Sequence, residues 1–186
     1  MRIVAGSLRG RKLSTLTGTD VRPTGDRVRE AVFNALGSMG VIEDATVLDL
    51  FAGSGALGLE AISRGAKHVT FVDSSPQALA IVRANIAACD CADTCTVVRS
   101  EAAAHLARSQ SAYDLVLLDP PYEFDSWPEL LSGLEAQTLV IESNRPIEAP
   151  AGSQVLRERR YGGTVVTVMA PILAVAIERP PSEEHS

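Results

Sequence analysis

A glycine-rich turn between an apolar run and a helix is the feature that most constrains the fold of this chain. Residues 46–51 are apolar except for one acid, a pattern typical of a buried parallel strand. Gly53, Gly55 and Gly58 follow in G-x-G-x-x-G spacing, and residues 56–64 have the composition of a helix. Glycines allow positive φ and close approach of a ligand, and a helix start presents backbone N–H groups. The stretch therefore predicts a strand–loop–helix unit that binds a ligand.

A second acidic position supports a nucleoside ligand. Residues 68–73 predict another strand, which ends in Asp73 about 20 residues past the loop. In dinucleotide-binding sheets a carboxylate at this spacing binds ribose hydroxyls. Strand, glycine loop and spaced acid together predict an adenosine-type ligand, and these three features do not distinguish one such ligand from another.

Length and composition narrow the class of protein. The 186 residues suffice for one domain with a real core and a small appendage. No apolar run reaches the ~18 residues of a membrane span, and the first residues lack the apolar segment of a signal peptide. We therefore expect a cytoplasmic protein that makes no use of a membrane.

Charge is unevenly distributed along the chain, although the net charge is only -6. Residues 1–30 carry seven cations against three acids, whereas the remainder carries ten cations against twenty acids. A basic leader on an acidic body indicates either a local contact with a polyanion or a solvated surface segment, and charge alone leaves both open. The cations of the leader are Arg2, Arg9, Arg11, Lys12, Arg22, Arg27 and Arg29.

Three cysteines, Cys89, Cys91 and Cys95, cluster in a C-x-C-x3-C pattern. A structural zinc site needs four ligands, and the nearest histidine, His105, stands ten residues on without a ligand-type pairing. We therefore expect reduced thiols at a helix–strand junction, and no metal.

The first part of the chain outside the glycine loop has two recognisable segments. Residues 1–12 have the pattern of a β-hairpin or an extended arm. Asp26 is the expected N-cap of an amphipathic helix over residues 27–36. Arg27 and Arg29 do not belong to the apolar stripe of that helix, so we expect their side chains to face solvent or a ligand.

Strands and helices alternate after the glycine loop. Alternating elements that end in a hairpin predict an α/β fold, a doubly wound sheet with an antiparallel edge. The hairpin signal is Tyr161-Gly162-Gly163. Residues 172–177 are either a further strand or a continuation of the hairpin, and residues 180–186 are expected to be disordered. Helices are expected at 76–88, 101–108 and 127–134, and strands at 94–98, 113–118, 137–142, 154–160 and 164–170.

Residues 119–122 stand where such a sheet places its ligand, outside the carboxyl end of a strand. The Asp119 carboxylate and the Pro120 carbonyl can accept two hydrogen bonds from one exocyclic NH₂ group, which would orient its nitrogen toward an electrophile. Pro121 helps to fix the backbone, and the ring of Tyr122 offers a face for an extruded base. The alternative is a strand-ending turn with a packed tyrosine.

Two stretches resemble the signature motifs of amino-directed S-adenosylmethionine-dependent methyltransferases: residues 49–55, Asp-Leu-Phe-Ala-Gly-Ser-Gly, and residues 119–122, Asp-Pro-Pro-Tyr. The flanks narrow the resemblance, because residues 1–13, 22–34 and 160–164 are similar to the bacterial 16S ribosomal RNA guanine-N2 methyltransferase family of the RsmD type. The likeness covers about residues 1–168, and the basic leader is its most specific part.

The resemblance implies a Rossmann-like class I methyltransferase, with a doubly wound, mostly parallel seven-stranded sheet and an antiparallel C-terminal hairpin. It implies a basic, RNA-contacting hairpin and helix at residues 1–40, a methyltransferase domain at 41–179 and a disordered tail at 180–186. The implied reaction moves a methyl group from S-adenosylmethionine to the exocyclic N2 of one guanine of 16S rRNA. The implied partner is the small ribosomal subunit or an assembly intermediate, bound by a monomer.

The resemblance also implies roles for individual residues. Asp119, Pro120 and Tyr122 would handle the target guanine, and Asp73 would bind the ribose hydroxyls of the cofactor. Glu101, with the Ala102 backbone, falls where such enzymes place an Asp against adenine. The implied cofactor-binding residues are Asp49, Phe51, Ala52, Gly53, Gly55, Asp73, Glu101 and Ala102. The implied RNA-binding residues are the seven cations of the leader.

Other functions remain open on the residues alone. A nicotinamide-dependent dehydrogenase fits the glycine loop and Asp73 equally well, but it leaves the D-P-P-Y turn and the basic leader unexplained. DNA adenine-N6 and protein glutamine-N5 methyltransferases share the logic of that turn, although this chain is too small to carry the added target-recognition domain of the DNA enzymes. A non-catalytic RNA-binding protein would need only the leader.

Overall fold

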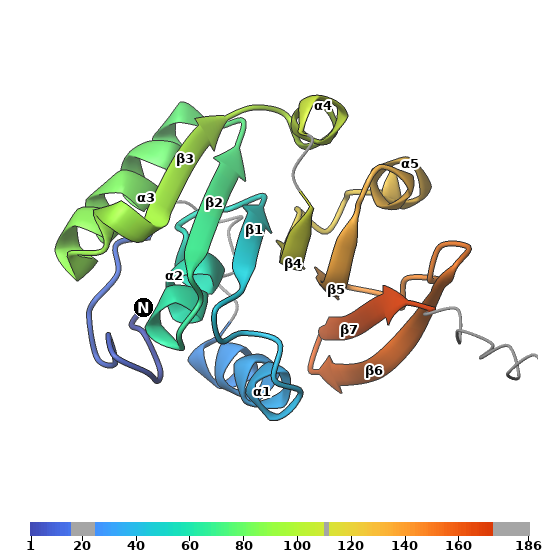
Figure 1. Ribbon diagram of the computed structural model, residues 1–186, viewed down its shortest axis with the longest axis horizontal. Helices are drawn as coiled ribbons and strands as arrows, with labels where there is room; N and C mark the ends of the chain where they lie inside the picture. The colour runs from blue at the N-terminus through green and yellow to red at the C-terminus, as the bar shows by residue number, and fades with distance from the viewer. Residues whose placement is uncertain (16–24, 110–111, 173–186) are drawn as a thin grey trace, which may run out of the picture.

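Seven strands form a single sheet in the computed structural model, which describes residues 1–15, 25–109 and 112–172 (Figure 1). Their order across the sheet is β3-β2-β1-β4-β5-β7-β6. The strands are β1 (Thr46–Leu50), β2 (His68–Asp73), β3 (Cys95–Arg99), β4 (Tyr113–Leu118), β5 (Ala136–Ser143), β6 (Ser153–Tyr161) and β7 (Thr164–Pro171). Strands β1 to β5 pair in parallel, which confirms the predicted doubly wound sheet.

The strand order at the C-terminal hairpin cannot be predicted from the sequence of its turn. Strand β7 pairs antiparallel with β5 on one side and with β6 on the other. The antiparallel strand is therefore internal, and β6 becomes the edge and runs parallel to β5. The predicted hairpin and the antiparallel pairing at this edge of the sheet are both confirmed, and the structure adds that the later strand of the pair, β7, inserts next to β5.

Helices cover both faces of the sheet (Figure 1). Side chains alternate along each strand, so Val47 packs with α1, α2 and α3 on one face, while Leu48 packs with α4 and α5 on the other. The helices are α1 (Asp26–Ser38), α2 (Ala56–Ser63), α3 (Pro76–Cys89), α4 (Ala102–Arg108) and α5 (Trp127–Ser132), with a short 3₁₀ turn at Ala92–Thr94. Among the described residues no helix is both long and apolar enough to cross a bilayer.

Local sequence signals predict the start of one helix correctly and that of another only approximately. The Ser75 hydroxyl accepts a hydrogen bond from the Ala78 N–H at 3.2 Å, and Pro76 occupies the first turn of α3, which begins where the sequence predicts. Helix α1 differs from the expectation, because it already includes Asp26. Gly25 is the N-cap residue of α1, and no side chain caps this end.

The N-terminal arm, residues 1–13, folds back on itself and packs against α2. Arg2 and Lys12 form an isolated antiparallel bridge, and Ile3 and Leu13 are buried in the same core cluster as the α1–α3 face of the sheet. Gly6 has φ of +85°, and a Cβ there would lie 1.8 Å from the Ser63 carbonyl oxygen. Only glycine allows so close an approach of the arm to α2.

Some expectations lie outside the described residues. These are the side chain of Arg22, all but the first residue of the segment 172–177, and the tail at 180–186. Within the described ranges, the buried side chains of residues 1–40 join the core of the sheet rather than forming a core of their own.

Candidate active site at the carboxyl edge of the sheet

The carboxyl ends of four neighbouring strands form one edge, which carries the residues expected to bind cofactor and target. Leu50 of β1 is in register with Val72 of β2 and with Leu118 of β4, and Val72 is in register with Val98 of β3. The segments that follow these strands therefore meet. In spatial order they carry Glu101, Asp73, the glycine loop and Asp119.

The glycine loop is held by its own main chain and by one carboxylate. The N–H groups of Phe51 and Ala52 both donate to the Val72 carbonyl at 3.0 Å, and the Gly53 N–H donates to Asp73 Oδ2 at 2.9 Å. Gly55 N–H donates to the Ala52 carbonyl at 2.7 Å. These N–H groups are therefore engaged within the protein, in contrast to the open N–H groups that the sequence suggests at the helix start.

Phe51 stands at a strained backbone position, since its φ is +72° although it is not a glycine. Such conformations cost of order 1–3 kcal/mol and cluster at functional sites. The ring of Phe51 packs edge-on against Phe124, with ring centroids 5.4 Å apart, and Phe124 packs in the same way against Trp127 at 5.0 Å. An aromatic row thus joins the glycine loop to the segment after the D-P-P-Y turn.

Asp49 orders the junction between loop and helix. Its buried Oδ2 accepts a hydrogen bond from the Gly58 N–H at 2.9 Å, which ties β1 to the first turn of α2. A Cβ at Gly58 would lie 2.3 Å from the Phe71 ring. The third glycine of the motif therefore serves the packing of α2 on β2, and the first two shape the loop.

The site is strongly acidic. Burial raises the pKa of Asp49 from its ordinary 3.8 to about 8, against the lowering effect of the Gly58 N–H, and the charges of Asp119 and Asp73 raise it further. Asp73 is oriented by two main-chain N–H groups, those of Gly53 and Ser75, at 2.9 and 2.8 Å. The two carboxylates next to the protonated Asp49, those of Asp73 and Asp119, favour a cationic ligand and oppose an anionic one.

Asp49→Asn is expected to change how stability depends on pH. The folded protein keeps the Asp49 proton up to about pH 8, whereas the unfolded chain loses it near pH 3.8, so stability falls as pH rises between these values. Asparagine does not titrate, so urea denaturation at pH 5.5, 6.5 and 7.5 should show the variant gaining on the wild type by up to about 1.4 kcal/mol per pH unit.

The exposed Asp44→Asn variant is the matched control, and its difference from the wild type should stay constant over this pH range. A constant difference for Asp49→Asn as well would mean that Asp49 is ionised throughout and would contradict the prediction.

The D-P-P-Y turn is fixed to the C-terminal hairpin. Pro120 is buried, and Asp119 and Tyr122 are partly exposed. The hydroxyl groups of Tyr122 and Thr164 share a hydrogen bond of 2.7 Å, and Asn144 Nδ2 donates to the Tyr122 carbonyl at 3.4 Å. The Tyr122 ring is therefore held at the same edge as the glycine loop by residues of β7 and the segment after β5.

Comparison with known proteins shows the family of this chain. The family model "Conserved hypothetical protein 95" matches residues 1–170. The chain belongs to this family, the RsmD family. A Haemophilus influenzae relative named ribosomal RNA small subunit methyltransferase D is 35% identical over 174 residues, which are 87% of this chain and 89% of that protein. The Escherichia coli K12 protein of the same name is 42% identical over 135 residues, 73% of this chain and 67% of its own.

A solved structure confirms the fold of this RsmD-family chain. The Escherichia coli protein yhhF superposes with a TM-score of 0.81 at 35% sequence identity, and the match covers 92% of this chain and 97% of that one. The seven-stranded architecture with its C-terminal hairpin is thus shared by a relative of nearly the same length.

Glu101 and Ala102 lie at the start of α4, beside the end of β2. The Ser100 N–H donates to the Asp73 carbonyl at 3.1 Å, which places residues 100–102 next to Asp73. Glu101 is exposed and occupies the N-cap position of α4, yet its side chain makes no capping hydrogen bond. The role expected for Glu101 against an adenine remains a prediction.

Asn85 is a site residue that the sequence reasoning missed. Its buried side-chain amide donates to the carbonyls of Ser14 and Ser54, at 3.0 and 2.8 Å, and its Oδ1 accepts from the Ser14 N–H at 2.8 Å. It therefore connects the arm to the glycine loop. A polar residue in the buried stripe of α3, three positions after Val82, is the signal that could have revealed it.

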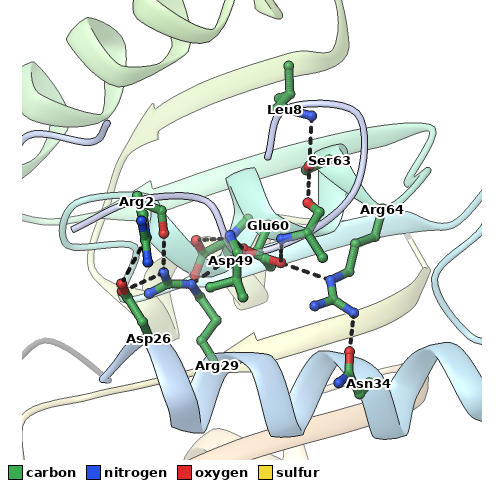
Figure 2. A network of polar contacts seen from close by, with 12 residues as sticks. Arg2, Leu8, Asp26, Arg29, Asn34, Asp49, Glu60, Ser63 and Arg64 are labelled. Carbon is green, nitrogen blue, oxygen red and sulfur yellow. Dashed lines mark hydrogen bonds and ion pairs between the residues drawn. The ribbon is translucent and has the colours of Figure 1, made fainter. Parts of the chain in front are cut away.

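Arg29 is the clear correction among the expected RNA-binding residues. Figure 2 shows its guanidinium between Asp26 and Glu60, and its side chain is fully buried. It lies 3.0 Å from Asp26 Oδ1 and 3.5 Å from Glu60 Oε2, and it donates to the Arg2 carbonyl. Arg29 is unavailable to RNA, because it neutralises the buried Glu60 and secures the arm.

Glu60 is the centre of this network (Figure 2). Its carboxylate is fully buried and accepts hydrogen bonds from the N–H groups of Val4 and Ala5, at 2.8 and 3.1 Å, and from Arg64 Nε at 2.8 Å. The arm is thereby attached to α2 by charge-assisted hydrogen bonds, which are stronger than neutral ones.

The other described cations of the leader are accessible. Arg11 donates to the Ala88 carbonyl at 3.1 Å, and Arg2 lies 3.9 Å from Asp26. The exposed side chains are those of Arg2, Arg9, Arg11, Lys12 and Arg27. Their contact with RNA remains a prediction, and Arg22 lies outside the described residues.

Two further features bear on ligands. A cavity of about 350 Å³ lies at the opposite, amino edge of β4 and β5, between Tyr113, Ala136 and Pro171, and is separate from the site above. Over the described ranges no group of three or more metal-binding side chains is found.

Proposed function

We propose that this protein transfers a methyl group from S-adenosylmethionine to the exocyclic N2 of a guanine in 16S rRNA, within the small ribosomal subunit or an assembly intermediate. Membership of a family whose relatives are named for small-subunit rRNA methylation supports the class of reaction. The observation that carries the proposal is the meeting of the acidic glycine-loop site with the D-P-P-Y turn at one edge of the sheet.

The charge of the site supports this cofactor over a dinucleotide. S-adenosylmethionine carries a sulfonium and an ammonium group, which an acidic site would attract, whereas a pyrophosphate would be repelled by Asp73 and Asp119. The N–H groups of Gly53 and Gly55 are engaged within the protein rather than open to phosphate oxygens. A nicotinamide-dependent dehydrogenase is therefore poorly supported.

In the proposed complex, Asp73 would accept the ribose hydroxyls, and Glu101 with the Ala102 backbone would meet the adenine. The methionine part of S-adenosylmethionine would lie along the main chain of the loop, at Phe51, Ala52, Gly53 and Gly55. Asp49 would maintain the conformation of this loop. Because Asp49 and Asp73 already accept main-chain N–H groups of this loop, their carboxylates are oriented before a ligand arrives.

The target amine needs activation, because its lone pair is delocalised into the guanine ring. Two acceptors, the Asp119 carboxylate and the Pro120 carbonyl, would hold both of its hydrogens and allow the nitrogen to rehybridise. As the N–CH₃ bond forms and the S–CH₃ bond breaks, Asp119 would stabilise the positive charge developing on nitrogen. A proton then leaves to water or to Asp119. The tethered Tyr122 ring would stack on the extruded base.

Tritiated methyl transfer to small subunits that lack the modification tests the proposal. We expect label in rRNA, and nucleoside analysis should identify N2-methylguanosine. Label in N6-methyladenosine, in DNA or in a protein glutamine would point to another amino-directed methyltransferase and refute the assignment. Quenching of Trp127 fluorescence by S-adenosylhomocysteine, but not by a nicotinamide dinucleotide, would test the cofactor independently, since Trp127 adjoins the Phe51–Phe124 row.

A further inference from the structure

Strand β6 carries an exposed row of arginines, which is separate from the basic residues of the N-terminal leader. Every residue from Gln154 to Arg160 is exposed, and three of the last four are arginines: Arg157, Arg159 and Arg160. Charged side chains on an edge strand commonly prevent pairing with another sheet. Acidic side chains would prevent such pairing equally well. The position of the arginines relative to the rest of the protein therefore decides whether they also bind a ligand.

Two of these arginines face α1. Arg157 and Arg159 are in register with Val168 and Val166, whose side chains belong to the α1–α3 face of the core. A shallow hollow separates β6 from α1, which lie beside each other in Figure 1. Its lining includes Ala31 and Ala35 from α1 and Arg157, Arg159 and Tyr161 from β6.

Arg27 of α1 is a third cation near this hollow, although it is not among the residues that line it. It is exposed and lies one helical turn before Ala31, on the same side of α1. Glu30, three residues after Arg27, is its exposed acidic neighbour on α1, on the flank toward Asn34 and Arg64 and away from Ala35. Within the described part of the chain, no ion pair joins Arg27, Arg157 or Arg159 to a carboxylate.

The hollow ends next to the proposed target site. Tyr161 at the end of β6 pairs with Thr164, and the Thr164 hydroxyl is hydrogen-bonded to Tyr122 at 2.7 Å. Strand residues two positions apart are about 6.6 Å apart along the strand. Arg159 and Arg157 therefore extend away from the D-P-P-Y turn in two steps, with their guanidinium groups on one side of the sheet.

The hollow itself is small, about 10 Å³, so RNA would lie across its rim. We propose that the exposed surface of β6 and α1 around the hollow binds the sugar–phosphate backbone of the RNA that flanks the target nucleotide, with Arg157, Arg159 and Arg27 contacting phosphates. This inference rests on the proposed function, because it assigns a path to the RNA of that reaction. Guanidinium groups suit phosphate recognition, and the small side chains of Ala31 and Ala35 do not obstruct the approach of RNA to the arginines. Contacts of this kind position RNA and do not read its sequence.

The test is the double variant Arg157→Gln/Arg159→Gln, with Arg108→Gln as the matched control. Arg108 is exposed on α4, which covers the opposite face of the sheet. Binding to 16S rRNA fragments containing the methylated site, and methyl transfer to hypomethylated small subunits, are measured from 50 to 200 mM salt. We expect roughly tenfold weaker binding or higher KM, with kcat and S-adenosylhomocysteine affinity unchanged.

The salt dependence gives a second readout. Loss of two phosphate contacts should lower the slope of log K against log salt by about 1.4 to 1.8, and Arg157→Lys/Arg159→Lys should restore most of it. Thermal melts of each variant establish that it folds. The inference is overturned if the glutamine variant binds RNA as the wild type does, or if the wild type does not bind these RNAs. RNA binding that depends on the arginines without any methyl transfer would sink the proposed function alone.

Discussion

Asp119→Ala is expected to reduce kcat for methyl transfer to small subunits by roughly 100- to 1,000-fold, the usual effect of removing one preorganised group that stabilises transition-state charge. Asp119 follows β4 at the carboxyl edge, and its charge contributes to the raised pKa of Asp49, so it lies within the site. The Pro120 carbonyl would remain as the single acceptor for the target amine. Single-turnover methyl transfer at saturating cofactor measures the effect on the chemical step.

The control for this variant is Asp125→Ala, an exposed acid six residues further along the same segment, which should stay within about twofold of the wild type. S-adenosylhomocysteine should bind Asp119→Ala with near-normal affinity, since this carboxylate is assigned to the target rather than to the cofactor. Wild-type kcat in Asp119→Ala would remove the residue from catalysis. Unchanged function in cells would favour a non-catalytic RNA-binding role.

Glu60→Gln is expected to lower the free energy of unfolding by about 3–5 kcal/mol, the typical cost of breaking a buried ion pair by removing one partner. Glu60 and Arg29 are both fully buried, and Arg64 Nε is bonded to the same carboxylate. The substitution leaves Arg29 with Asp26 as its only carboxylate among the described ion pairs. Urea denaturation measures the loss.

A double-mutant comparison separates charge from shape. Arg29→Met/Glu60→Gln also removes the buried cation that loses one of its two carboxylates in Glu60→Gln, so the double variant should be more stable than Glu60→Gln alone. Glu43→Gln, at an exposed position, should change stability by less than about 0.5 kcal/mol. A Glu60→Gln variant as stable as the Glu43→Gln control would show that the network contributes little, and the docking of the arm would need another explanation.

The candidate site was largely predictable, because its signals are local. Gly53 and Gly55 follow a buried strand directly, and the run before Asp119 alternates between the two core clusters as a central strand must. Strand β4 spans the residues expected for it. The rule that ligands bind at the carboxyl ends of parallel strands then brings these segments together without any knowledge of side-chain contacts.

Features that depend on distant partners were not predictable. Arg29 lies outside the apolar stripe of α1, so helical periodicity predicts that it faces solvent or a ligand. Its burial depends on Glu60, which lies on another helix and supplies the opposite charge. Asn85 likewise looks like an ordinary polar position until Ser14 and Ser54 are seen to meet it.

The amino-acid sequence alone determined the strand–loop–helix unit, the acids at the strand ends and the family, because each is encoded in contiguous residues whose backbone and charge preferences are local. Tertiary structure alone decided that Arg29 is buried, that β7 inserts between β5 and β6, and that the β6 arginines lie beside α1 and end near Tyr122. Ion pairs and strand pairs of this kind join residues that are far apart in the sequence. No pattern in neighbouring residues specifies which distant residue becomes the partner.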